Sequence, residues 1–210
     1  MRGKIEAGEY VRPCDGERQS GDAAFVQFQD DGVLIALVDV LGHGKAAHVL
    51  AVSLTESLSK WLREVRSPSP DAALTVLHEA ARGTRGAVAS VAWINATTLE
   101  GNVTGIGNVR CRLFGSAAKT IKFDDGLLGF RARSRMPVSL ALMPADVLLL
   151  FSDGVSERFD VSQYPTLTLD PAPAIAFNIV RRFGKGRDDA SCAVLRCKPG
   201  PLEPSPLEGR

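Results

Sequence analysis

The run Val33–Val40, VLIALVDV, constrains the fold most, because it is almost continuously aliphatic yet far too short to cross a membrane. A second strand-like run, Ala23–Gln29, precedes it, and Asp30-Asp31-Gly32 between them is typical of a β-hairpin turn. From Gly44 the apolar residues recur in steps of three and four, which indicates an amphipathic helix. We therefore expect a buried antiparallel hairpin that leads directly into a helix.

Strand-like runs outnumber helical ones in the rest of the chain. The first helix stops before the prolines of residues 67–70, and Pro70-Asp71 opens a second helix that runs to about Arg82. A third helix is predicted over Ala172–Phe183. Further strands are predicted over Val88–Asn95, Asn102–Thr104, Val109–Phe114, Thr120–Phe123, Ala145–Phe151 and Ala190–Cys197, with a hairpin-type turn at Asp124-Asp125-Gly126. This order lacks regular strand–helix alternation, so it predicts an α+β fold in which helices pack outside antiparallel sheets.

Size and charge narrow the class of protein. The 210 residues fit one large domain, which we expect over residues 1–197, and the proline-rich segment 198–210 is predicted to be a disordered tail. A net charge of +1 gives no basic footprint for nucleic acid, and no polybasic arm points to a membrane surface. The four cysteines form no CxxC pair, and the first residues lack the apolar core of a secretory signal. We therefore expect a reduced, cytoplasmic protein that is a monomer.

Aspartates recur at the edges of the predicted strands, in four short motifs. Asp39 and Asp153 end strongly hydrophobic runs, where carboxylates are rare unless they are paired or bound to metal. If the edges meet, two bare carboxylates roughly 4 Å apart repel each other by about 4 kcal/mol at an effective dielectric constant near 20, so cations are required. Oxygen ligands alone favour Mg²⁺ or Mn²⁺. The four motifs are Ser20-Gly21-Asp22, Val38-Asp39-Val40, Ser152-Asp153-Gly154 and Arg187-Asp188-Asp189-Ala190.

Other interpretations of these motifs stay open at this level. Each aspartate could cap a turn or a helix, and Asp188 with Asp189 could form a turn before the last strand. The stretch around Gly42 is not a phosphate-binding P-loop, because Asp39 stands where that motif has its first glycine and Ala46 replaces its serine or threonine. A basic segment could attract a phosphorylated protein or could be a solvated helix end; it comprises Arg181, Arg182, Lys185 and Arg187.

Taken in order, the motifs SGD, DVLGHG, FSDGV and DDAS resemble those of metal-dependent protein phosphatases of type 2C. The sequence is more similar to their bacterial branch, the SpoIIE-like serine phosphatases, and most similar to feedback phosphatases of the stressosome. The resemblance spans roughly residues 12–197. It implies an antiparallel β-sandwich flanked by α-helices in four layers (αββα), with two Mn²⁺ or Mg²⁺ ions at one end. It also implies a phosphoserine and phosphothreonine phosphatase whose partners are phosphorylated STAS-domain proteins of the stressosome.

The resemblance assigns roles to individual residues. Asp39 would bridge both cations, and the carbonyl of Val40 would bind one of them. Asp153 and Asp188 would hold the second cation, which Asp22 would also ligate or whose waters it would orient. A water activated by the cation pair would attack phosphorus directly. The leaving oxygen would take its proton from a metal-bound water or from His43.

Three departures from the eukaryotic members of the family bear on these roles. Asn108 stands where those members have the aspartate of a third metal, which argues against a third tightly held cation. His43 lies further along the chain from Asp39 than in their Asp-Gly-His-Gly motif. Their phosphate-binding arginine has Arg18 as its nearest candidate in this chain.

Two other functions fit the same motifs. A catalytically silent phosphatase-like domain would bind a partner without turnover, but loss of a metal aspartate would mark such a domain, and none is lost here. A two-metal hydrolase of small phosphoesters or nucleotides would share the site and differ only in substrate.

Overall fold

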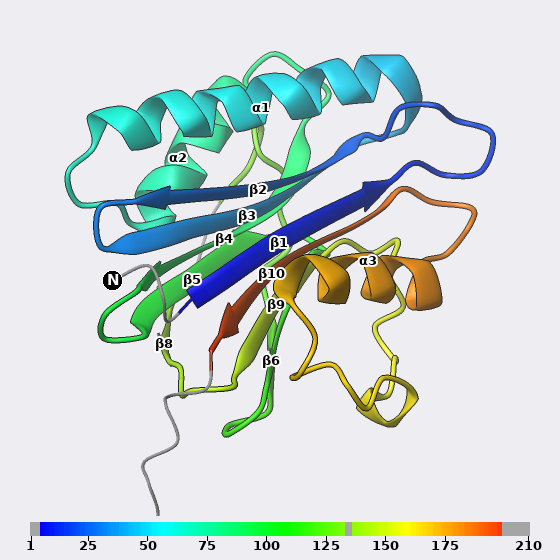
Figure 1. The fold of residues 1–210 in the computed structure, drawn as a ribbon. Helices are drawn as coiled ribbons and strands as arrows, with labels where there is room; N and C mark the ends of the chain where they lie inside the picture. Colours follow the sequence, from blue (N-terminus) through cyan, green and yellow to red (C-terminus); the bar gives the residue numbers. More distant parts are fainter. Residues whose placement is uncertain (1–4, 133–135, 199–210) are drawn as a thin grey trace, which may run out of the picture.

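The computed structural model describes residues 5–132 and 136–198. They form two five-stranded sheets in which neighbouring strands run antiparallel (Figure 1). One sheet has the order β1 (Ile5–Arg12), β10 (Ala190–Cys197), β9 (Val147–Phe151), β6 (Arg110–Phe114) and β7 (Lys119–Lys122). The other has the order β2 (Asp22–Gln29), β3 (Gly32–Val40), β4 (Ala87–Asn95), β5 (Glu100–Ile106) and β8 (Val138–Ala141). The α-helices are α1 (Gly44–Glu64), α2 (Pro70–Ala80) and α3 (Ala172–Phe183), and a short 3₁₀ helix, η2, covers Val161–Gln163.

The sheets and helices stack in four layers, with a hydrophobic core at each of the three junctions (Figure 1). The middle core lies between the sheets and includes Ile35 of β3 and Leu150 of β9. α1 and α2 cover the outer face of the β2–β8 sheet through a core that includes Leu54 and Leu77. α3 covers the other sheet, where Ile175 is fully buried. The predicted α+β fold, a β-sandwich flanked by helices in αββα order, is therefore confirmed.

The helices begin and pack as their sequences predict. The buried side chains of α1 recur in steps of three and four residues, so one stripe of the helix faces the sheet. α2 begins with Pro70 after the N-cap residue Ser69, whose hydroxyl accepts a hydrogen bond from the Ala72 amide at 3.3 Å. None of the helices in the described ranges combines the length and the apolar character needed to cross a membrane.

The alternation of side chains along β2 and β3 decides where their aspartates point. Alternate residues from Val33 to Leu37 belong to the core between the sheets, and the residues between them belong to the core beneath the helices. Asp39 continues the first series, so it lies on the sheet-facing side at the end of β3. Ala24 of β2 also packs between the sheets, which puts Asp22 on the same side at the start of β2.

The predicted strands and helices are present, with ends that differ by a few residues. Two further strands, β1 and β8, escaped sequence analysis. β1 contains Gly8 and two glutamates, yet it pairs with β10 along its whole length. Gly8 is required because α3 passes directly over it, and a Cβ there would collide with the backbone of Pro173. β8 is a four-residue strand at the edge of its sheet, too short to give a clear period.

The interpretation of Asp124-Asp125-Gly126 as a hairpin turn was wrong. β7 pairs with β6, the strand before it, and residues 127–132 after the turn form two isolated bridges, of Leu127 with Arg131 and of Leu128 with Ala87. Leu128 is fully buried in the core beneath the helices, so burial of this segment replaces regular pairing. Of the predicted disordered tail, only Lys198 lies within the described residues.

Candidate functional site

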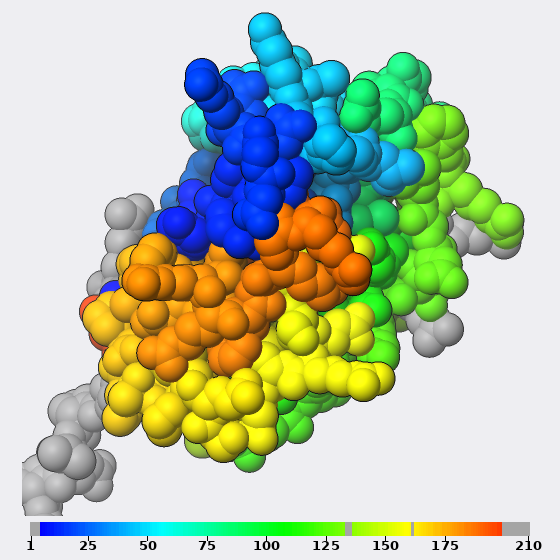
Figure 2. All heavy atoms as spheres, turned by 90° about the vertical axis from the view of Figure 1, so that its right-hand side faces the viewer, coloured from blue at the N-terminus to red at the C-terminus, as the bar shows by residue number. Residues whose placement is uncertain are grey.

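The four aspartate motifs meet at one end of the sandwich. Asp22 and Asp39 are register partners in the β2–β3 pair. Asp153 follows the end of β9, and Asp188 precedes the start of β10, which pairs with β9 in antiparallel fashion. These segments surround a cavity of about 240 Å³. Figure 2 faces this end of the molecule, where the blue β1–β2 loop, the light-blue start of α1 and the orange segment before β10 come together.

Most of the residues predicted for the site line this cavity, which we call the aspartate cavity. Arg18 is not among the lining residues: it is exposed in the loop between β1 and β2. The full lining comprises Asp22, Asp39, Val40, Leu41, Gly42, His43, Val88, Asn108, Asp153, Asp188 and Asp189.

The cross-strand pair Asp22 and Asp39 carries the largest electrostatic cost. The Asp22 carboxylate accepts a hydrogen bond from the Ser191 hydroxyl at 2.7 Å. Burial, with smaller contributions from Asp189 and Asp153, raises the pKa of Asp22 to about 7, although bonds from Ser152 and Ser191 work in the opposite direction. Burial and then the Asp22 charge raise the pKa of Asp39 to about 9. Bound cations would relieve the repulsion that keeps these groups protonated.

Asp153 is held by two neighbours from other segments. The side-chain amide of Asn108 donates a hydrogen bond to its carboxylate at 2.5 Å, and the Lys185 ammonium donates one to its carbonyl oxygen at 2.5 Å. Burial and the charge of Asp188 raise the pKa of Asp153, whereas Lys185 and Asn108 lower it. Asn108, which by resemblance stands where eukaryotic members of the family have the third-metal aspartate, is here a hydrogen-bond donor to Asp153.

Asp188 and Asp189 differ sharply in their surroundings. The Asp189 carboxylate is buried and accepts hydrogen bonds from the amides of Cys14, at 2.8 Å, and Gly21, at 2.6 Å. It therefore ties the β1–β2 loop to the start of β10. The Asp188 side chain is exposed and makes no hydrogen bond within the described ranges. Of the two, Asp188 has its oxygens available for a ligand, as the sequence motif predicts.

His43 is the N-cap residue of α1, at the rim of the cavity. Its side chain makes no capping bond and instead places Nδ1 2.9 Å from a carboxylate oxygen of Glu17. The carboxylate of Glu17 also lies against Gly44, whose φ of +75° suits glycine. Glu17 therefore orients the imidazole ring and leaves Nε2 as its unengaged nitrogen.

Several residues around the cavity were missed by sequence reasoning. Ser191 follows the Asp188-Asp189 pair and lies on the sheet-facing side of β10, so strand alternation from Asp189 could have found it. Lys185 belongs to the basic segment noted above, but nothing in the sequence ties its ammonium group to Asp153. Glu17 lies in an irregular loop, and no periodic pattern brings it to His43.

The donor set fits divalent cations in its chemistry, and the side chains as placed are spread apart. No group of three or more His, Cys, Asp or Glu side chains in residues 5–132 and 136–198 is drawn together tightly enough to hold a metal ion. Carboxylates without counter-ions repel one another, and Ser191 and Asn108 hold two of them by hydrogen bonds. Oxygen-only ligands with raised pKa values are the kind of site that Mg²⁺ or Mn²⁺ stabilises.

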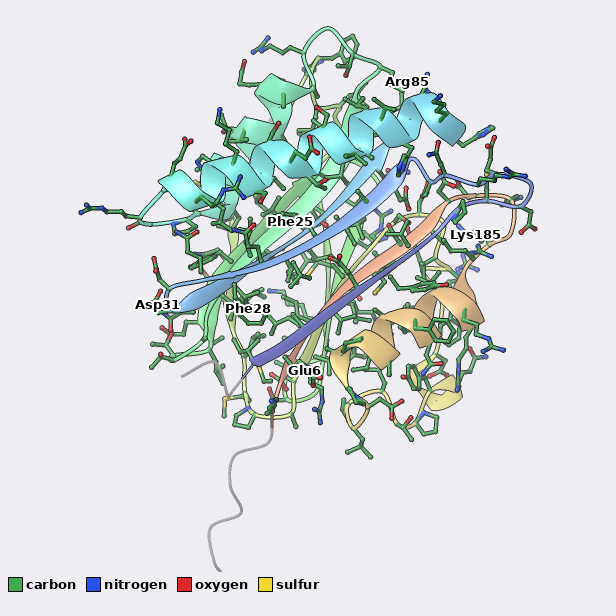
Figure 3. The ribbon with its side chains drawn as sticks, turned by 45° about the horizontal axis from the view of Figure 1, so that its top comes forward. Glu6, Phe25, Phe28, Asp31, Arg85 and Lys185 are labelled. Carbon is green, nitrogen blue, oxygen red and sulfur yellow. The ribbon has the colours of Figure 1, made fainter. Side chains whose placement is uncertain are left out.

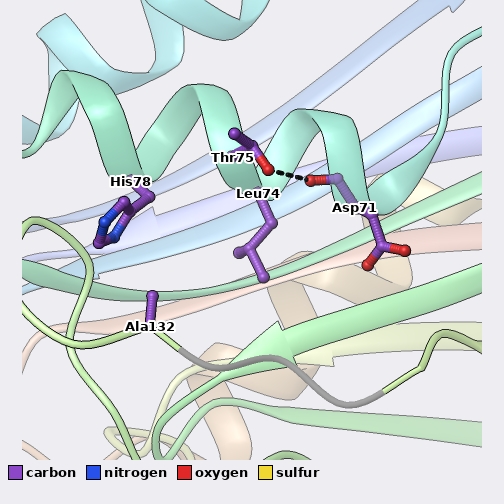
Figure 4. A pocket seen from close by; sticks show the side chains of 5 residues that line it. All are labelled: Asp71, Leu74, Thr75, His78 and Ala132. Atoms are coloured by element: carbon purple, nitrogen blue, oxygen red, sulfur yellow. Dashed lines mark hydrogen bonds between the residues drawn. The ribbon is translucent and has the colours of Figure 1, made fainter.

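A second cavity, also about 240 Å³, lies against α2 and contains different chemistry (Figure 4). It is lined by Asp71, Leu74, Thr75, His78 and Ala132. The Thr75 hydroxyl donates to the Asp71 carbonyl, and His78 Nδ1 accepts from the Gly129 amide at 3.2 Å. With one carboxylate and a histidine that is already bonded, this cavity lacks the charge density of the aspartate cavity.

Comparison with solved structures finds the same fold in phosphatases. A protein described with the bacterial stressosome, "a modular system that has been adapted to control secondary messenger signaling", superposes with a TM-score of 0.80 at 24% identity, over 92% of this chain and 100% of that one. RsbX in complex with magnesium superposes with a TM-score of 0.76 at 19% identity, over 93% of this chain and 96% of that one. The PP2C phosphatase domain of SpoIIE from Bacillus subtilis, solved with a fragment of its regulatory domain, superposes with a TM-score of 0.72 at 17% identity, over 92% of this chain and 63% of that one.

Sequence comparison identifies the family. A search of curated proteins gave no match. The family model described as stage II sporulation protein E (SpoIIE) matches residues 29–198, which is most of the chain and includes the motifs around Asp39, Asp153 and Asp188. The chain therefore belongs to the SpoIIE family.

Proposed function

We propose that this protein is a metal-dependent phosphatase that hydrolyses phosphoserine and phosphothreonine in a protein substrate. The observation that carries the proposal is the aspartate cavity, in which carboxylates from both sheets converge. All five of its aspartates lie in the motifs that resemble those of type 2C phosphatases. Membership of the SpoIIE family supports the same reaction class.

In this proposal the chain's own residues hold two divalent cations and the substrate. Asp39 would bridge the cations, the Val40 carbonyl would bind one, and Asp153 and Asp188 would hold the other, with Asp22 as its ligand or as the orienter of its waters. When bound, the cations would supply an activated water and offset the charge of the phosphoryl group. No covalent intermediate is required, and the cysteines are unsuited to one, since all four are buried and burial raises the pKa of the Cys14 thiol.

The supporting side chains would keep the ligands in position. Ser191 holds Asp22, and Asn108 holds one oxygen of Asp153. Such outer contacts fix the orientation of ligand carboxylates. In this proposal His43, whose Nδ1 lies 2.9 Å from a Glu17 carboxylate oxygen, would donate a proton to the leaving ester oxygen through Nε2.

The finer proposal concerns the substrate. We propose that it is a phosphorylated STAS-domain protein of a stressosome and that its dephosphorylation resets a stress signal. The support is the likeness in fold to RsbX and to the stressosome protein described above. A phosphorylated STAS protein, a phosphopeptide and free phosphoserine, assayed side by side, would separate this substrate from small phosphoesters.

Release of p-nitrophenol from p-nitrophenyl phosphate tests the reaction class. We expect turnover by the wild type with Mn²⁺ or Mg²⁺, none with chelator, and loss of turnover in both Asp39→Asn and Asp153→Asn. Asp30→Asn is the matched control, because Asp30 is an exposed turn residue at the other end of the β2–β3 hairpin. Metal binding without turnover of any phosphorylated substrate would favour a silent domain, and turnover that survives in Asp39→Asn would refute the site.

A further inference from the structure

We propose that Arg85 binds the phosphoryl group of the substrate. This inference rests on the proposed phosphatase function and deepens it by naming a substrate-binding residue outside the metal ligands. Arg85 lies in the connection between α2 and β4, far along the chain from Arg18, the nearest candidate in the sequence. Figure 3 shows Arg85 at the same end of the molecule as Lys185 and away from Asp31 at the opposite end.

The guanidinium group of Arg85 is fixed against the wall of the aspartate cavity. Its Nη1 donates a hydrogen bond to the carbonyl oxygen of Leu41 at 3.0 Å. A Cβ added at Gly42 would come within 2.9 Å of the same nitrogen, so the group lies directly on this backbone. Leu41 and Gly42 both line the cavity, between Asp39 and His43. Arg85 is exposed and is not itself a lining residue, so it is anchored beside the cavity on the backbone of two residues that are. Its remaining N–H groups make no hydrogen bond to the described residues.

Arg85 has no acidic partner in the described part of the chain. Other arginines nearby are neutralised: Arg110 pairs with Glu157 at 2.6 Å, and Arg82 donates two hydrogen bonds to Glu79. A guanidinium group has five N–H donors in a planar fork, and among the described residues Arg85 makes one side-chain hydrogen bond. The free part of this fork suits two oxygens of a phosphate, which guanidinium binds in bidentate fashion.

The charge of the cavity creates a need for such a group. Five aspartates and no lysine or arginine line it. Bound cations would neutralise part of this charge, but a phosphoryl dianion would still enter beside several carboxylates. Lys185 is already engaged with the Asp153 carbonyl. The guanidinium group of Arg85, held beside Leu41, would attract the phosphoryl oxygens that face away from the metal ligands.

Arg18 fits this role less well than Arg85. Both arginines are exposed and neither is a lining residue of the cavity, but Arg18 makes no side-chain hydrogen bond within the ranges that the structure describes. Ordering a free arginine on binding costs conformational entropy, and Arg85 has met part of that cost through its bond to Leu41.

Steady-state kinetics with p-nitrophenyl phosphate and Mn²⁺ test the assignment. For Arg85→Ala we expect KM and the inhibition constant of inorganic phosphate to rise about tenfold, as loss of one charge-assisted bond predicts, with a small change in kcat. The Mn²⁺ concentration for half-maximal activity should not change, since no metal ligand is touched. For Arg85→Lys, KM and the phosphate inhibition constant should lie between those of the wild type and those of Arg85→Ala, because lysine keeps the positive charge and lacks the planar fork of donors.

Arg82→Ala is the matched control, since Arg82 is an exposed arginine three residues away that is paired with Glu79. It should leave all these constants unchanged. Unchanged KM and phosphate inhibition in Arg85→Ala would overturn the proposal. It would also be overturned if Arg18→Ala raised both constants about tenfold and Arg85→Ala did not.

A binding readout keeps this inference separate from the proposed reaction. If the wild type turns over no phosphoester, the phosphatase function fails, and Arg85 is then judged by calorimetric titration of inorganic phosphate into the Mn²⁺-loaded protein. Weaker phosphate binding in Arg85→Ala, at an unchanged melting temperature, would support the assignment. Equal binding by both proteins, or none by the wild type, would refute it.

Discussion

Asp22 and Asp39 stand directly opposite each other on β2 and β3, with both side chains on the face that the two sheets share. Directly opposed residues of an antiparallel pair have Cβ atoms about 4.5–5.5 Å apart, and like charges there are destabilising. Burial adds to the cost, because both carboxylates lie beside the hydrophobic core. A pair of this kind destabilises the metal-free protein and is stabilised by bound cations. A mutation that removes one of the two carboxylates should therefore raise the stability of the metal-free protein while it abolishes activity.

Asp39→Asn should stabilise the metal-free protein and abolish its response to metal. The amide keeps the size of the side chain and is neutral without a proton, whereas Asp39, with its pKa raised to about 9, has to take up a proton on folding at pH 8. We therefore expect the free energy of unfolding in chelator to rise by about 1–3 kcal/mol at pH 8. The rise in melting temperature on adding Mn²⁺, clear in the wild type, should be lost. Thermal unfolding with and without Mn²⁺ measures both effects, and Asp30→Asn should behave as the wild type.

The metal-free protein should lose stability as the pH rises from about 5 to about 9. The pKa of Asp39 is raised to about 9 and that of Asp22 to about 7, whereas aspartate in an unfolded chain has a pKa of about 4. Between these values the folded state holds protons that the unfolded state has released, so the free energy of unfolding falls with rising pH. Melting temperatures in chelator across this range measure the slope.

Saturating Mn²⁺ should remove most of that slope, since the cations bind the deprotonated carboxylates. Asp39→Asn should also flatten it, because one of the two raised groups is gone. A melting temperature in chelator that stays constant or increases over this pH range would contradict the electrostatic account of the pair.

Ser191→Ala should destabilise the protein and weaken metal binding. The Ser191 hydroxyl donates to the Asp22 carboxylate at 2.7 Å, and its loss removes one of the hydrogen bonds that this buried carboxylate accepts. We expect a loss of about 1.5–3 kcal/mol in unfolding free energy and about 10–100-fold in apparent Mn²⁺ affinity. Ser90→Ala is the control: Ser90 is equally buried in β4, and its hydroxyl has no hydrogen-bond partner in the described structure. Equal effects of the two changes would refute the role of Ser191.

Gly154→Ala should damage the site without removing any ligand. A Cβ at Gly154 would collide with the backbone of Asp189, so the loop after β9 and the segment before β10 would have to separate. We expect a loss of about 1–3 kcal/mol in unfolding free energy together with weaker Mn²⁺ binding. Gly83→Ala, with a φ of +70° and open space around the glycine, should cost about 1–2 kcal/mol and leave Mn²⁺ affinity unchanged.

The layered fold was predictable because hydrophobic pattern and motif order agree. The aliphatic run that ends at Asp39 can only be a strand buried on both faces, and the structure gives it one core on each side. β1 was missed because its pattern is weak on its own and its stability comes from pairing with β10, residues 190–197, at the far end of the chain. Pairing between segments so distant leaves little local signal.

The site was predictable only as a set of strand ends. Antiparallel pairing brings Asp22 to Asp39, and this follows once the hairpin is recognised. The contacts of Glu17 with His43 and of Arg85 with Leu41 depend on loops whose paths no periodicity encodes. This is why sequence analysis named Arg18, near in sequence to the SGD motif, as the nearest candidate and did not single out Arg85, whose bond to Leu41 exists only in three dimensions.

Asn108→Asp tests whether the missing third-metal aspartate changes the behaviour of the site. Asn108 donates a hydrogen bond to Asp153, and an ionised aspartate cannot do so. In chelator we therefore expect a loss of about 1–3 kcal/mol in unfolding free energy, from the lost donor and the added like charge. With Mn²⁺ the variant should recover this stability and bind one more ion than the wild type in a calorimetric titration. Asn102→Asp, in β5 and outside the aspartate cavity, should change neither quantity. An Asn108→Asp protein as stable in chelator as the wild type would show that the bond to Asp153 does not hold this carboxylate in solution.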